Sequence, residues 1–85
     1  MESLILLNRL SPGSLGIVRQ LTARGSVRRR LLDLGLIADT KVKPLMRSPF
    51  GDPIAYEIRG TVIALRKEEA SKILVESVDI VSQNR

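Results

Sequence analysis

Residues 26–36 read SVRRRLLDLGL, and their spacing predicts a short helix in a chain whose other segments have strand-like patterns. Val27, Leu31 and Leu34 are separated by four and then three positions, so they fall on one face of a helix. Gly35 follows them, and glycine most readily adopts the left-handed conformation in which many helices end. The stretch therefore predicts a short amphipathic helix with a sharp end.

The two ends of this helix carry further signals. Ser26 is of a residue type that commonly caps a helix N-terminus with its side-chain oxygen. At the other end, Leu36 can fold back as the apolar contact of a Schellman motif. We therefore expect Ser26 to cap the helix and Gly35 to terminate it.

The segments on either side of the helix predict strands, because apolar and polar residues alternate along them. Pro44 removes a hydrogen-bond donor from its strand, which predicts an edge position or a bulge. Residues 4–7 form either a short extra strand or a segment packed on the sheet, and residues 66–72 predict one helical turn. The expected strands are residues 15–21, 41–47, 54–58, 61–65 and 73–75.

These elements predict a mainly β protein. Five to six short strands, one short inserted helix and one helical turn before the last strand give a small, partly open antiparallel barrel of the SH3-like kind. Residues 1–85 are expected to form a single domain, with residues 77–85 as a frayed polar tail.

The composition excludes most familiar active sites. The chain has no Cys and no His, so disulfides, thiolate or imidazole metal sites, cysteine nucleophiles and Ser-His-Asp relays are impossible. We expect no catalytic residue, no enzyme activity, no cofactor and no metal site, with only weak transition-metal binding through carboxylates.

The longest apolar run, residues 4–7, is far shorter than the roughly 20 residues that span a bilayer, so we expect a cytoplasmic protein without direct membrane insertion.

The charge favours an acidic partner. Lys and Arg number 14 against 9 Asp and Glu, for a net charge of +5. Nucleic acid, a lipid surface and an acidic protein all fit that charge. Small barrels that bind single-stranded nucleic acid stack bases on aromatic side chains, and the only aromatic residues are Phe50 and Tyr56, which argues against that class.

The segment from Arg28 to Leu36 resembles the signature of the FeoA-type ferrous iron transport protein A family. Further matches, in the same order as in the family, are Leu10-x-Pro12-Gly13, Gly51-Asp52-Pro53-Ile54 and Leu65-Arg66-x-x-Glu69-Ala70. The resemblance implies an SH3-like barrel that serves as the cytoplasmic accessory of a large ferrous iron transporter, whose soluble part is a GTP-binding domain. This chain would then be peripheral at the inner membrane through its partner.

One turn departs from the family pattern. Family members commonly carry Pro-Gly after the helix, where this chain has Ala38-Asp39. If the turn requires a positive φ, aspartate adopts it at a higher energetic cost than glycine.

The arginines at the helix start are the first candidates for partner binding. Arg28, Arg29 and Arg30 lie where the helix dipole disfavours cations. They form a solvated face, with Asp33 able to pair with Arg29 and Arg30, or they dock an acidic surface of a partner. A third alternative is that one of them enters a GTPase site as an arginine finger.

Leu32 is the most informative candidate. It stands about 140° around the helix from Val27, outside the apolar stripe. It is either covered by the open mouth of the barrel or exposed as an apolar anchor rimmed by charge, the usual composition of a docking site.

The loop after the second predicted strand carries the remaining candidates. Pro49 and Phe50 sit at its tip, where they either grip a peptide or pack to close the loop. Gly51 is expected to be a turn residue.

The expected function is that of a cytoplasmic accessory protein of ferrous iron uptake, which docks onto the GTP-binding part of a ferrous iron transporter and modulates transport. Two alternatives remain open: a small basic barrel that binds nucleic acid, and a regulatory domain that binds transition-metal ions. The sequence does not decide the oligomeric state.

Overall fold

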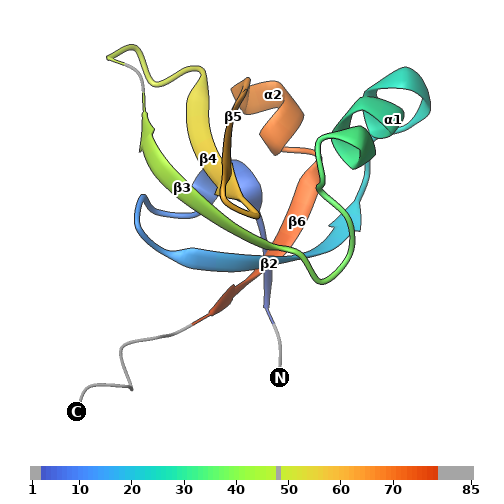
Figure 1. Ribbon diagram of the computed structural model, residues 1–85, viewed down its shortest axis with the longest axis horizontal. Coiled ribbons are helices and arrows are strands. Elements are labelled where there is room, and N and C mark those ends of the chain that lie inside the picture. Colours follow the sequence, from blue (N-terminus) through green and yellow to red (C-terminus); the bar gives the residue numbers. More distant parts are fainter. Residues whose placement is uncertain (1–2, 48, 79–85) are drawn as a thin grey trace.

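Six strands pair antiparallel in the order β1-β6-β2-β3-β4-β5 in the computed structural model, which describes residues 3–47 and 49–78. The sheet curls into a partly open barrel with the helices α1 and α2 at one end (Figure 1). This confirms the predicted mainly β, antiparallel architecture. The strands are β1 (Leu4–Leu6), β2 (Leu15–Leu21), β3 (Lys41–Arg47), β4 (Ile54–Ile58), β5 (Thr61–Leu65) and β6 (Ile73–Val78); the helices are α1 (Gly25–Asp33), α2 (Lys67–Ala70) and the 3-10 turn η1 (Leu7–Arg9).

The hairpin of β4 and β5 shows how the sequence sets the register. Ile54, Tyr56 and Ile58 are buried, while the residues between them are partly exposed, as alternation predicts. Arg59 and Gly60 join the strands with φ values of +54° and +81°, the geometry of a tight hairpin turn. The predicted pair of strands is confirmed.

Pro44 lies at the bulge that the sequence predicts. The register between β3 and β4 shifts between Pro44 and Met46. On its other side, β3 pairs with β2 only at Val42 and Lys41, so the ladder needs no N–H from the proline.

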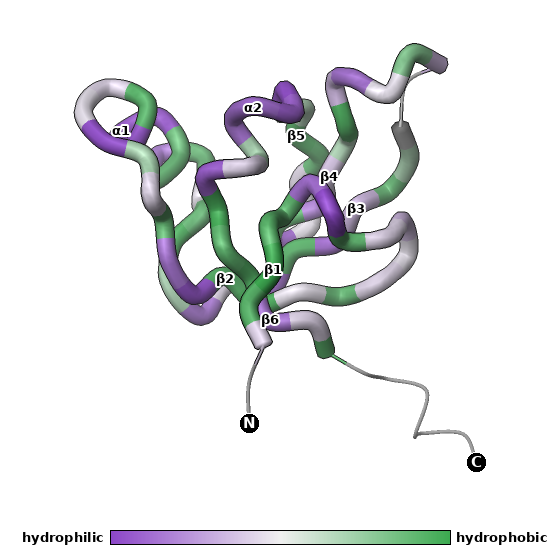
Figure 2. Tube along the Cα trace, turned by 180° about the vertical axis from the view of Figure 1, so that it is seen from behind, coloured by the Kyte–Doolittle hydropathy of each residue, from purple (hydrophilic) through white to green (hydrophobic). Residues whose placement is uncertain are grey.

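The core collects buried side chains from β2 to β6 and from each helix, and the partly buried Ile5 of β1 packs against it. Figure 2 shows apolar stretches of β1 and β2 lying close to β6, with which both strands pair. The largest fully buried side chains are those of Leu7, Val18, Leu31, Leu36, Val42, Pro44, Tyr56, Leu65, Ile73 and Val75.

The C-terminus of α1 is the predicted Schellman motif. Gly35 has a φ of +104°, its N–H donates to the carbonyl of Leu32 at 3.0 Å, and the N–H of Leu36 donates to the carbonyl of Leu31 at 3.1 Å. Leu36 is fully buried, which confirms the apolar contact that the sequence predicts.

The N-terminus of α1 differs from the prediction, because Ser26 is not the N-cap. The helix begins at Gly25, and the cap position is Arg24, whose backbone is extended and whose side chain makes no capping hydrogen bond. Gly25 has a φ of +63° and turns the chain into the helix one residue early, which places Ser26 inside the first turn.

The predicted end of the last strand is also wrong. β6 continues to Val78 because Ser77 pairs with Gly16 and Val78 pairs with Leu15. Ser77 and Val78 therefore belong to the sheet, and the rest of the predicted tail, residues 79–85, lies outside the described residues.

The predicted helical turn before β6 is α2. Its first amide, that of Lys67, donates to the Asp52 carboxylate at 2.8 Å, and the Glu69 carboxylate accepts the N–H of Arg66 at 3.0 Å.

Across the described part of the chain, no helix is long and apolar enough to cross a membrane.

We predict that Gly35→Ala lowers the free energy of unfolding by about 1 to 3 kcal/mol, because a side chain at this φ is strained. Ser26→Ala is the matched control on the same helix, and it should change that free energy by less than about 0.5 kcal/mol because Ser26 caps nothing. Urea denaturation measures both. A decrease of about 1 kcal/mol in the free energy of unfolding of Ser26→Ala would instead indicate that Ser26 caps the helix.

Candidate docking site

A groove runs between α1 and β2 and has a volume of about 210 Å³. It is lined mainly by apolar residues together with two arginines, a composition that suits recognition of another macromolecule. The residues that define it are Arg19 and Leu21 on β2, Arg28 and Leu32 on α1, and Leu36 and Ala38 just beyond the helix.

Leu32 is the large apolar residue of this groove that is exposed. Its exposed fraction is 36%, whereas Leu31, its neighbour in the chain, is fully buried. The helix directs Leu31 into the barrel, and the next residue, about 100° around the axis, faces outward. The alternative in which the barrel mouth buries Leu32 is therefore wrong.

The three arginines of the signature have different surroundings. The Arg28 guanidinium donates to the carbonyl of Leu21 at 3.2 Å, which ties the start of α1 to the end of β2. Arg29 is exposed and makes no ion pair with any residue that the structure describes. Arg28 and Arg29 share with Leu32 a second depression of about 250 Å³ on the outer face of α1. These three side chains form one surface, which we call the α1 face.

Arg30 does not belong to the α1 face. Its guanidinium forms an ion pair with Glu69, which fastens α1 to α2. The predicted pairing of Arg30 with Asp33 is therefore replaced by a contact between the two helices. Arg30 borders a different depression, together with Val27 and Lys72.

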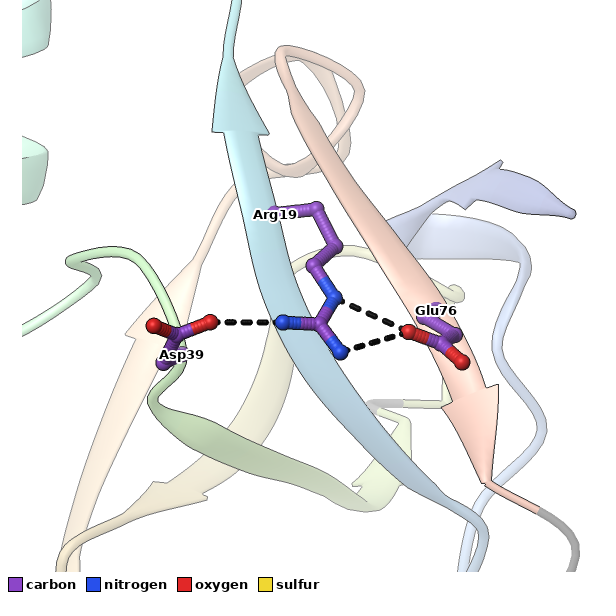
Figure 3. Close-up of polar contacts among 3 residues, drawn as sticks. All are labelled: Arg19, Asp39 and Glu76. Carbon is purple, nitrogen blue, oxygen red and sulfur yellow. Dashed lines mark hydrogen bonds and ion pairs between the residues drawn. The ribbon is translucent and has the colours of Figure 1, made fainter. Parts of the chain in front are cut away.

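The opposite wall of the groove is held by a contact that the sequence did not reveal. Arg19 on β2 lies between two carboxylates: its Nε and Nη2 donate to Glu76 at 2.9 and 2.7 Å, and its Nη1 donates to Asp39 at 2.5 Å (Figure 3). The backbone N–H of Asp39 also donates to the carbonyl of Val18 at 2.7 Å. These bonds hold the turn after α1 against β2.

Asp39 shows why the departure from the family's Pro-Gly pattern matters. Its φ is +72°, so this turn requires the left-handed conformation, as we anticipated for the case of a positive φ. Aspartate is among the side chains that tolerate this region best, and here the carboxylate also binds Arg19.

The other predicted partner-binding residues lie elsewhere. Pro49 and Phe50 are at the tip of the loop between β3 and β4, which Figure 1 shows on the opposite side of the barrel from α1. Phe50 is 93% exposed, so the alternative that it packs to close the loop is wrong. Gly51 has a φ of +81° and is a turn residue, as predicted. The structure does not bring this loop together with the α1 face.

The chemistry of the side chains limits what these surfaces can hold. Within residues 3–47 and 49–78, no three acidic side chains gather in a group that could bind a metal ion. Tyr56 is fully buried, which leaves Phe50 as the one aromatic ring available for base stacking. The arrangement is best suited to binding an acidic surface that carries an apolar residue.

The model of the FeoA domain family matches residues 5–77. A Fe(2+) transport protein A/Fe(2+) transporter FeoB fusion protein of Porphyromonas gingivalis is 31% identical over 72 residues, which are 85% of this chain and 8% of the fusion protein. This chain thus spans a small part of that relative's length.

Solved structures show the same fold. A FeoA-like protein from Clostridium acetobutylicum is 37% identical, with a TM-score of 0.85 over 93% of this chain and 92% of the other. The zinc complex of FeoA from Stenotrophomonas maltophilia, a prokaryotic SH3 domain protein, is 26% identical, with a TM-score of 0.72 over 88% of each chain. These likenesses confirm the predicted SH3-like fold.

Two substitutions at Asp39 separate its backbone role from its ion pair. We predict that Asp39→Ala lowers the free energy of unfolding by about 1 to 2 kcal/mol, because alanine adopts a positive φ poorly and the contact with Arg19 is lost. Asp39→Asn keeps the conformational tolerance and should cost less than about 1 kcal/mol, the range of exposed ion pairs. Equal losses in thermal or urea denaturation would show that the φ of residue 39 is unimportant.

Proposed function

The chain belongs to the FeoA domain family, and from this premise we propose that it is a cytoplasmic accessory protein of ferrous iron uptake. It docks through the α1 face onto the cytoplasmic GTP-binding part of a ferrous iron transporter and modulates transport. The family is one of transport accessory domains and is not a known enzyme family.

The observation that carries this proposal is the exposure of Leu32 between Arg28 and Arg29. An exposed leucine on a helix fixed to a barrel can enter a pocket of a partner without any rearrangement of the fold. The arginines beside it then surround the apolar contact with charge, which is the usual anatomy of a protein interface.

The electrostatics of α1 favour an acidic partner. The first turn of α1 contains no acidic residue, so the positive end of the helix dipole and the charges of Arg28 and Arg29 repel one another. Asp33 lines the same depression but forms no ion pair with either arginine within the described residues. A carboxylate-bearing surface would relieve this repulsion on binding. The contact should therefore weaken as salt concentration rises.

The fusion protein of Porphyromonas gingivalis supports the choice of partner. In that relative, a region similar to this chain is part of one polypeptide with a ferrous transporter sequence. A covalent link supplies a high effective concentration, so even a weak contact between the two parts can be populated. A separate chain must obtain its affinity from side chains, and the α1 face offers them.

We predict that the isolated protein binds the soluble cytoplasmic domain of a cognate transporter and that Leu32→Asp reduces this affinity by at least about tenfold. The Arg28→Glu, Arg29→Glu double variant should have a similar effect and should abolish the salt dependence. Both variants should stay folded, because all three side chains are exposed. Isothermal titration calorimetry with each nucleotide state of the partner provides the measurement.

Met46→Asp is the matched control. Met46 is 67% exposed on β3, outside the α1 face, so a charge there should leave the affinity unchanged. Loss of binding in Phe50→Ser with full binding in Leu32→Asp would move the interface to the β3–β4 loop. Absence of binding by the wild-type chain in every nucleotide state would contradict the proposal and favour the nucleic acid alternative.

A further inference from the structure

The strand β5 forms an unprotected end of the sheet. It pairs with β4 on one side and, among the residues that the structure describes, has no strand on the other. Proteins usually protect such edges with short strands, charges, prolines or bulges. β5 has five residues, Thr61–Leu65, with no charged residue, no proline and no shift in its register with β4.

The outer side of β5 offers backbone hydrogen bonds. The tight turn at Arg59 and Gly60 makes Ile58 and Thr61 a hydrogen-bonded pair, and the pairing alternates from there along the hairpin. The N–H and C=O groups of Val62 and Ala64 therefore point away from β4. In the described part of the chain, no turn, loop or side chain supplies a hydrogen bond to them.

The β5 side chains on one face of this edge are apolar. Val62 is 60% exposed and Ala64 is exposed on the same face. Glu57 lies opposite Val62 on β4, and Ala55 lies opposite Ala64. An added strand with small or β-branched side chains would cover Val62 and Ala64 while it hydrogen-bonds to their backbone.

Cations lie at both ends of the edge. Arg59 is exposed in the turn before β5, and Lys67 is exposed just after it; neither forms an ion pair within the described residues. Arg66 is also largely exposed, and its nearest carboxylate, that of Asp52, is 4.0 Å away. An occupant of this edge should therefore carry acidic residues on both sides of an apolar centre.

The same charges disfavour a second copy of this chain. Antiparallel pairing of two β5 strands about Ile63 uses the whole strand, and it brings the turn that carries Arg59 of one copy near Lys67, at the start of α2, of the other. Like charges that are brought close together repel each other and weaken such a pairing. The charge pattern thus selects a different polypeptide.

We propose that the free edge of β5 binds an extended segment of a partner protein as an added strand, with apolar residues over Val62 and Ala64 and carboxylates beside Arg59 and Lys67. None of these residues belongs to the α1 face. This second surface is therefore independent of the docking function proposed above.

The test uses a blocked, fluorescently labelled peptide whose centre alternates valine and threonine over the length of β5 and is flanked by glutamates. The full chain should bind it, and hydrogen exchange at the amides of Val62 and Ala64 should slow in the complex. Ala64→Pro removes one outward N–H and should weaken binding by about tenfold or more, the equivalent of about 1.4 kcal/mol. Val62→Lys should have the same effect by placing a charge on the edge.

Two controls make the result specific. Leu4→Lys changes β1, the other end of the sheet, and should leave peptide binding unchanged. The Arg59→Glu, Lys67→Glu double variant should lose the glutamate-flanked peptide and gain a lysine-flanked one. Melting curves identify folded variants, and Val62→Lys decides the question if Ala64→Pro fails to fold.

Several results would overturn the proposal. These are a wild-type chain that does not bind the peptide, equal binding of both peptides by the wild type, and undiminished binding by folded edge variants. A wild-type dimer in sedimentation that Val62→Lys dissolves, without peptide binding, would assign the edge to a second copy instead.

Discussion

The hydrogen bond from the Leu36 amide to the Leu31 carbonyl, 3.1 Å long, fixes the position of α1 on which the candidate docking site depends. It closes the helix through Gly35, whose positive φ reverses the chain, and it brings both leucines into the barrel with no exposed surface. Burial of each such side chain contributes about 1.5 to 3 kcal/mol. With two leucines buried on either side of the turn, α1 cannot rotate about its axis, and Leu32 has to face outward.

Polar contacts also hold α1 on the barrel, but the burial of the two leucines determines its position. Arg28 reaches the end of β2 and Arg30 reaches Glu69 on α2, so the helix is attached to the barrel on both flanks. Exposed contacts of this kind contribute little to stability, typically up to about 1 kcal/mol each. The arginines of the signature therefore have different roles. Arg30 is used within the fold, while Arg29 remains directed to solvent beside Leu32.

The sequence predicted the helices and strands whose signals are local. It did not predict contacts between segments that lie far apart in the chain. The β4–β5 hairpin follows from alternation and from Gly60, which takes the positive φ of the tight turn. Ser26 was misassigned because its capping preference, about 1 kcal/mol, competes with Gly25, where the chain turns into α1 one residue earlier. The bridge from Arg19 to Glu76 joins residues 57 positions apart. This contact depends on the register between β2 and β6, which no local sequence pattern predicts.

The central claim, that the α1 face is the docking surface, is tested most directly by an NMR titration of the labelled chain with the cytoplasmic domain of a cognate ferrous iron transporter. If the α1 face binds the transporter, the largest changes will fall on the methyl groups of Leu32 and on the amides of Arg28 and Arg29, with little change in β4. Changes concentrated in the β3–β4 loop, with the α1 signals unmoved, would contradict it.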